Sequence, residues 1–172
     1  MEVIANIIGI AAVIVFILSY QFKTRRGIIL CSGASRILYI LQYVLLGAFS
    51  GAVFDIVGVF TTLLADKKDK PFIKKYLVPV FILSNLAVVG IGILLYKNAF
   101  DLLPMFGILF ETGALWLNDE KYIRIVSFFG APCWLIYNLS TVAYGSAIGN
   151  VFTMVSIIVA FIRYDIKKVK VK

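Results

Sequence analysis

The feature that most constrains this chain is a series of apolar segments, each long enough to cross a lipid bilayer, that fills nearly its whole length. A helix needs about 20 mostly apolar residues to cross the hydrocarbon layer. Segments of this kind lie at Val3–Gln21, Ile28–Leu46, Ser50–Ala65, Tyr76–Tyr96, Ala99–Leu117, Tyr122–Leu139 and Ala143–Arg163. Because hydrocarbon offers no hydrogen-bond partners, each backbone amide must be satisfied within its own segment. The sequence therefore predicts an all-α membrane protein with seven transmembrane helices.

The composition excludes the common soluble classes. Of the 172 residues, 62% are hydrophobic and 15% are charged, whereas a soluble domain has about half apolar and about a quarter charged residues. The two cysteines, Cys31 and Cys133, are too few for a disulfide scaffold. Histidine is absent, which removes the commonest zinc ligand and catalytic base. We therefore predict no metal, no cofactor and no enzymatic activity.

The distribution of basic residues predicts the orientation of the chain in the membrane. Of the 17 Lys and Arg residues, 15 follow the first, third, fifth and seventh predicted spans; Lys97 lies on the other side and Arg36 lies inside a span. Basic loops stay in the cytoplasm, so we expect the N-terminus outside and the C-terminus inside. Topology and contact with anionic lipid account for the net charge of +8, and no nucleic-acid partner is predicted.

The first three and the last three predicted spans share one layout. Each triplet has a polar loop after its first span and a very short outer turn after its second, at Gly47–Phe49 and Ser140–Tyr144. The span Tyr76–Tyr96 between them lets the second triplet start on the same side as the first, as in transporters with parallel repeats. The predicted domains are residues 1–66, a first three-helix bundle; 67–98, a basic loop and linker helix; and 99–172, a second bundle with a basic tail.

A shift of 95 residues superimposes the two triplets without a gap. It places Tyr39 on Trp134 and Asp55 on Asn150. Literal identity between the triplets is low, so this internal repeat depends on the layout and on the polar positions.

The stretch Asp101–Arg163 resembles the bacterial inner-membrane YgjV family, within the SWEET and PQ-loop superfamily. The resemblance is carried by the LLP start, the LW that follows, the CW-(aliphatic)2-(aromatic)-N cluster and the final IRY. It implies an inner-membrane protein of two parallel three-helix bundles joined by a linker helix, a 3+1+3 arrangement. In the superfamily's sugar facilitators, an aromatic residue on the second helix of a bundle faces an Asn on the third, and these residues hold the solute. The matching substrate-binding positions here are Tyr39 with Asp55, and Trp134 with Asn150.

Three charged residues, Arg36, Asp55 and Glu111, fall within predicted spans at least five residues from either end. A charge at a helix centre costs about 2.5–3.5 kcal/mol on insertion scales, so such residues usually face protein or water. One hypothesis pairs Arg36 with Asp55 beside Tyr39 at the edge of a central cavity; the alternative is a fixed structural pair such as Arg36 with Glu111. Glu111 is the candidate for proton coupling, and the alternative is a carboxyl that stays neutral or reaches the inner edge of the membrane.

Trp134 and Asn150 carry the clearest prediction of a solute site. A ring face and an amide can hold a hydroxylated or heterocyclic solute by stacking and hydrogen bonds. The alternative is that Trp134 packs against a neighbour and that Asn150 bonds across helices. Near the outer end, Tyr43 and Tyr137 are predicted as interfacial belt residues, with an outer vestibule as the alternative.

The leading functional prediction is a transporter or facilitator for a small polar solute, in which the two bundles alternate access to a site between them. The alternative is a non-transporting binding or regulatory membrane protein on the same scaffold. The expected partners are the solute and the lipid bilayer. One chain contains both halves, and a homo-oligomer is compatible with this prediction.

Overall fold

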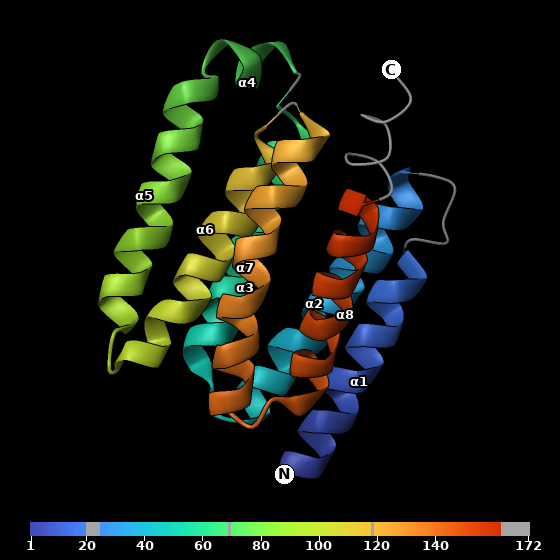
Figure 1. The fold of residues 1–172 in the computed structure, drawn as a ribbon. Coiled ribbons are helices and arrows are strands. Elements are labelled where there is room, and N and C mark those ends of the chain that lie inside the picture. Colours follow the sequence, from blue (N-terminus) through green and yellow to red (C-terminus); the bar gives the residue numbers. More distant parts are fainter. Residues whose placement is uncertain (20–24, 69, 118, 163–172) are drawn as a thin grey trace.

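The computed structural model describes residues 1–19, 25–68, 70–117 and 119–162. Within these residues the chain is helical (Figure 1). The elements are α1 (Glu2–Ser19), α2 (Arg25–Leu45), α3 (Phe49–Asp66), α4 (Pro71–Lys75), α5 (Leu77–Leu95), a 3-10 turn η1 (Ala99–Asp101), α6 (Leu102–Leu115), α7 (Glu120–Ser140) and α8 (Tyr144–Phe161). The expected all-α fold is therefore confirmed.

Each predicted span contains one long helix, and its ends agree within three residues. The short helix α4 was not predicted; it begins at Pro71, whose fixed φ suits a first helical position. By length and apolarity alone, α5 and α8 are long enough to cross a membrane, and the apolar stretches Glu2–Phe16 and Phe49–Thr61 are shorter. Lys23 and the basic residues of the C-terminal tail lie outside the described residues.

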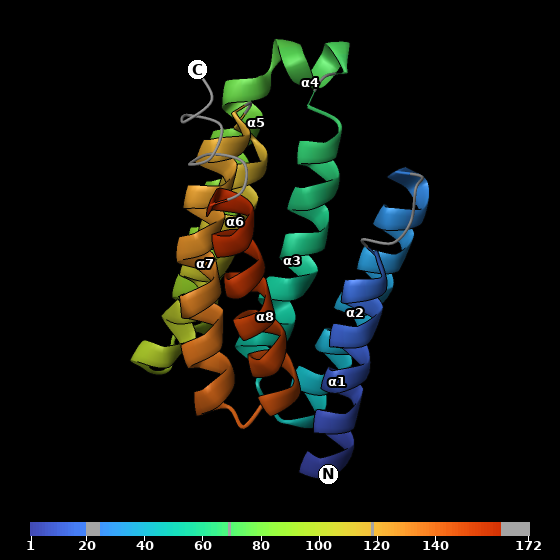
Figure 2. The same cartoon turned by 45° about the vertical axis from the view of Figure 1, so that its right-hand side comes forward.

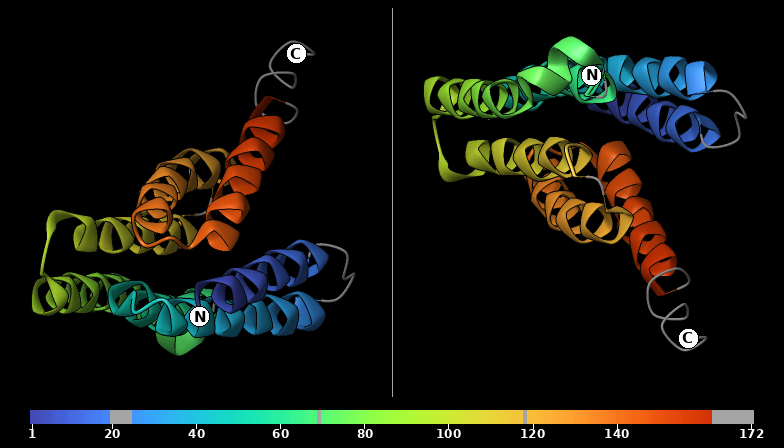
Figure 3. Two further views of the ribbon diagram at one scale, coloured as in Figure 1. Left: turned by 90° about the horizontal axis from the view of Figure 1, so that it is seen from below. Right: turned by 90° about the horizontal axis from the view of Figure 1, so that it is seen from above.

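The long helices of the two triplets, α1–α3 and α6–α8, pack in the same order. Helix α2 packs against α1 and α3, and α7 packs against α6 and α8. Across the triplets, α1 packs against α8 and α3 against α6. Figure 3 shows α6, α7 and α8 on one side, and α1, α2 and α3 with α5 on the other. The first helix of each triplet therefore contacts the third helix of the other.

The predicted offset of 95 residues recurs in the helix boundaries. Arg25–Leu45 and Glu120–Ser140 differ by 95 at both ends, and so do Phe49–Asp66 and Tyr144–Phe161. The connecting turns match as well, because Gly47 has φ 70° and its equivalent Val142 has φ 60°. A β-branched residue rarely adopts this left-handed conformation. Val142 therefore keeps the shape of the turn against its own local preference.

The two turns lie at the same end of the molecule as the start of α1 (Figure 2). We call this the turn end, and we call the opposite end, which carries α4 and its neighbouring lysines, the basic end. Helices α1 and α6 both run from the turn end toward the basic end (Figure 1).

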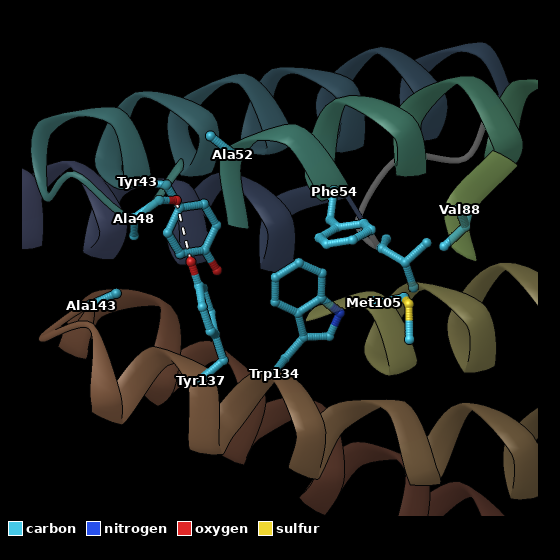
Figure 4. Packing of buried hydrophobic residues seen from close by; sticks show 10 residues of the cluster. Tyr43, Ala48, Ala52, Phe54, Val88, Met105, Trp134, Tyr137 and Ala143 are labelled. Carbon is cyan, nitrogen blue, oxygen red and sulfur yellow. Dashed lines mark hydrogen bonds between the residues drawn. The ribbon is translucent and has the colours of Figure 1, made fainter. Parts of the chain in front are cut away.

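The core lies between the two triplets and is rich in aromatic rings (Figure 4). Tyr43 from α2, Phe54 from α3, and Trp134 and Tyr137 from α7 are all buried there. The prediction that Tyr43 and Tyr137 form an interfacial belt is therefore wrong, because both rings point inward and pack against the opposite triplet. Large apolar side chains such as Phe60, Leu94 and Phe152 are exposed on the outside, as expected of a surface covered by lipid.

Candidate functional site

The four predicted binding residues lie at one depth. Tyr39 and Trp134 are six residues before the last residues of α2 and α7, and Asp55 and Asn150 are six residues after the first residues of α3 and α8. At 1.5 Å per helical residue, this depth is about 9 Å from the turn end. Residues from four helices thus form one layer, on the side of the turns that faces the basic end.

The contacts of these four residues connect four different pairs of helices. Asp55 and Trp134 are buried, and Asn150 is partly buried. The Trp134 ring stacks on Tyr43 with a centroid distance of 6.2 Å and an interplanar angle of 18°, and it lies beside Phe54 in Figure 4. The Tyr39 hydroxyl lies against α8, since a Cβ built at Gly149 would be 3.0 Å from it.

A chain of hydrogen bonds connects the two triplets between this layer and the turn end. The Tyr43 hydroxyl donates to Asn138 Oδ1 over 2.7 Å, and Asn138 Nδ2 donates to Asn150 Oδ1 over 2.7 Å. Tyr43 and Asn138 are 95 residues apart, so they are equivalent positions of the two triplets in direct contact. The alternative prediction for Asn150, a hydrogen bond across helices, describes its contact in this structure.

A second pair of contacts obeys the same offset. Ser146 Oγ donates to Gln42 Oε1 over 2.5 Å, and the Gly51 amide donates to the Tyr137 hydroxyl over 2.9 Å. Adding 95 to 42 and 51 gives 137 and 146, so each contact is the image of the other. The residue types differ while the geometry of the contact is retained.

A third pair lies at the first helices of the triplets. The Gly145 amide donates to Asn6 Oδ1 over 3.1 Å, and Ser50 Oγ donates to Asp101 Oδ1 over 2.7 Å. Asn6 and Asp101 are again 95 apart, as are Ser50 and Gly145. The turn end is therefore joined by reciprocal hydrogen bonds between α1 and α8 on one side and between α3 and the start of the second triplet on the other.

The charged residues in the interior of the predicted spans form one cluster across three helices. Arg36 Nη1 donates to Asp55 Oδ1 over 2.8 Å, and Arg36 Nη2 lies 3.9 Å from Glu111 Oε2. Both pairings proposed for Arg36 therefore occur together. The first is a short charge-assisted hydrogen bond, whereas the second is too long for a hydrogen bond and acts through charge alone. Arg36 thus connects α2 to α3 and α6.

The indole nitrogen of Trp134 is a buried donor without a hydrogen-bond partner. It points at α6, because a Cβ built at Gly107 would overlap it. Leaving a buried donor unpaired costs about 1–3 kcal/mol, which makes this atom an unusual feature of the core. Among the described residues, no group of three or more His, Cys, Asp or Glu side chains is placed to hold a metal ion.

Sequence reasoning missed the polar contacts at the turn end. Gln42 and Asn138 are not among the predicted site residues. The offset of 95 contained a usable signal, because it aligns Tyr43 with Asn138 and Gln42 with Tyr137, so that both triplets carry polar residues at the same two positions.

No curated protein and no solved structure matches this chain. Residues 3–168 match a family described as bacterial inner membrane protein. This match covers nearly the whole chain and agrees with the apolar composition and the helical fold. The chain therefore belongs to the Imp-YgjV family of bacterial inner membrane proteins.

Proposed function

We propose that this protein transports or facilitates the passage of a small polar solute across the bacterial inner membrane by alternating access. The two halves are α1–α3 and α6–α8, and α5 links them in a 3+1+3 arrangement like that of SWEETs. The observation that carries the proposal is the reciprocal packing of the halves, in which each first helix contacts the opposite third helix with matching hydrogen bonds.

The distribution of hydrogen bonds between the halves supports a rocking motion. Those formed by Asn6, Gln42, Tyr43 and Tyr137 all lie within about two helical turns of the turn end. At the basic end, Lys68 Nζ donates to the carbonyl of Leu117 over 2.7 Å. Halves that are joined by more hydrogen bonds at the turn end can separate at the basic end, and in the predicted orientation the turn end faces the periplasm.

The proposed solute site lies next to the turn end, on its side toward the basic end. Trp134 and Tyr39 supply ring faces, while Asn150 and Asp55 supply hydrogen-bonding groups at the same depth. Rings and amides of this kind suit a hydroxylated or heterocyclic solute. Solute entry requires Asn150 to exchange its bond with Asn138 for a bond with the solute. Such an exchange would connect solute binding directly to the Tyr43–Asn138 contact between the halves.

A thermal-shift screen on the purified protein tests this proposal first. A solute that binds the folded state alone raises the melting temperature by mass action, and sugars, nucleosides, vitamins and amino acids are the classes to screen. We expect Trp134→Ala and Asn150→Ala to abolish the shift. Ile136→Ala is the matched control, because Ile136 lies on the same helix with its side chain exposed to the outside.

The same solute is then measured for uptake into proteoliposomes. Uptake that is lost in Trp134→Ala and kept in Ile136→Ala supports transport through the proposed site. A solute that binds but is never taken up contradicts transport and instead supports a non-transporting binding protein.

A further inference from the structure

We propose that the cluster of Arg36, Asp55, Glu111 and Trp134 is a binding site for one proton, which the Glu111 carboxylate takes up and releases. The proposal deepens the transport function and rests on it for its role as the coupling site. Its chemistry is simple, because the carboxylate oxygen gains a proton from water and later returns it, and no other bond changes.

The charge balance of the cluster favours uptake of one positive charge. With all groups ionised, one guanidinium faces two carboxylates, which leaves a net charge of −1 within the membrane. Asp55 holds the short contact with Arg36, and its side chain is only 8% exposed. Glu111 holds the long contact and is 29% exposed. A buried excess charge is costly, so Glu111 is the carboxylate whose protonation removes it most readily.

The repeat shows that the helix arrangement does not need these charges. Under the offset of 95, Arg36 corresponds to Ala131, Asp55 to Asn150, and Glu111 to Phe16. The second copy of the same packing is therefore built with uncharged residues. A cluster that serves only to hold helices together would be expected in both copies, so its presence in one points to a task other than packing.

Trp134 provides evidence for the site that is independent of the charges, because one of its polar atoms lacks a partner. Its indole N–H is buried without a partner and bears on α6 at Gly107, one helical turn before Glu111 and on the same face. A Cβ built at Gly130 would lie 3.1 Å from Glu111 Cγ, so this glycine provides room beside the carboxyl. An ionised Glu111 can accept from both Arg36 Nη2 and Trp134 Nε1, whereas a protonated Glu111 needs neither.

Titratable groups face Glu111 from α2, α3 and α7, whereas α5, which also packs against α6, carries none. Arg36 and Asp55 face it from α2 and α3, and Cys133 faces it from α7. Tyr39 neighbours Arg36 on α2. The Cys133 thiol donates to the carbonyl of Phe129 over 3.4 Å. The Arg36 guanidinium stays protonated. Each of the other groups is a potential source of a pH-dependent signal, so each must be separated from Glu111 by a variant.

The fluorescence of Trp134 provides a test that needs no solute. The chain has two tryptophans, so Trp116→Phe leaves Trp134 as the one indole. Its emission is titrated with pH in detergent, over the range in which circular dichroism reports an unchanged fold. We expect a single one-proton transition, because a charge next to the indole changes its emission. Glu111→Gln should abolish the transition, Asp55→Asn should move its midpoint, and Cys133→Ala and Tyr39→Phe should leave it in place.

Several outcomes would overturn the proposal. They are the absence of a transition in Trp116→Phe, a transition that survives in Glu111→Gln, and a transition that is lost in Cys133→Ala. A Glu111-dependent change produced at constant pH by replacing choline chloride with sodium chloride would assign the site to a metal cation instead of a proton. Glu111→Asp guards against misfolding, since it keeps the carboxyl and should keep the transition.

The titration also separates this proposal from the proposed function. A Glu111-dependent transition in a protein that moves no solute leaves the proton site in place and removes transport. Solute uptake without such a transition keeps transport and removes the proton site.

Discussion

The Tyr43 hydroxyl donates a 2.7 Å hydrogen bond to Asn138 Oδ1, and the two residues occupy the same position in the two halves of the chain. In a structure with twofold pseudo-symmetry, equivalent residues touch each other only near the symmetry axis. The contact therefore marks the line along which the halves meet. It also lies next to Asn150, which accepts a hydrogen bond from the same Asn138 side chain.

Removing this contact should weaken the turn end. Tyr43→Phe deletes the hydroxyl and leaves the buried Asn138 Oδ1 without its donor, which we expect to lower stability by about 1–3 kcal/mol. Thermal unfolding in detergent measures the change. The control is Tyr144→Phe, which makes the same substitution at an exposed residue of the turn end and should have no measurable effect. Equal melting temperatures for Tyr43→Phe and Tyr144→Phe would contradict the role of this contact.

The charge cluster makes a second prediction. Arg36→Met removes the one cation of the cluster and leaves two carboxylates uncompensated, which should destabilise the protein by about 3 kcal/mol. We place the effect at the low end of values for buried pairs because the Arg36 side chain is 24% exposed. The double variant Arg36→Met, Asp55→Asn should recover part of this loss in chemical unfolding. If the double variant is less stable than Arg36→Met, the pairing is not the source of the effect.

The approach of α1 to α8 makes a third prediction. A Cβ built at Gly145 would lie 2.8 Å from the backbone of Asn6 and Gly9, which cannot move aside easily, whereas one built at Gly113 meets nothing within 4 Å. Gly145→Ala should therefore cost about 1–3 kcal/mol through overpacking. Gly113→Ala should be neutral or stabilising by up to about 1 kcal/mol from its helix propensity. The comparison fails if both variants unfold at the same temperature.

The proposed orientation makes a fourth prediction. Cysteine introduced at Lys70, beside α4, should react with a membrane-impermeant maleimide only after the inner membrane is opened. Cysteine introduced at Lys97, after α5, should react in cells whose outer membrane alone is permeable. Both side chains are exposed, so access to the reagent depends on the side of the membrane. Labelling in the reverse pattern would invert the orientation inferred from the basic loops.

The helices and their repeat could be predicted from the sequence because apolar length and polar spacing determine them directly. The offset of 95 was derived from layout and recurs in the ends of α2 and α7. Helix α4 was missed because five residues are too short to show a period.

The direction of side chains was harder to predict. Tyr43 and Tyr137 lie near helix ends, where a belt residue and a core residue have the same sequence environment; only the identity of the neighbouring helix decides between them. The partner of Arg36 stayed open for the same reason, since Asp55 and Glu111 lie on different helices and both proved to be near it.

The most direct test of the central claim is a pair of spin-label distances, measured by double electron–electron resonance in lipid with the two native cysteines replaced by serine. One pair of labels is placed at Leu64 and Val159, equivalent exposed residues near the basic ends of α3 and α8. The other is placed at Phe49 and Tyr144, equivalent exposed residues at the turn end. Alternating access predicts two distances for each pair. Tyr43→Phe should increase the population of the longer turn-end distance and, together with it, the population of the shorter basic-end distance. One unchanged distance at both ends, with and without that substitution, would contradict the account.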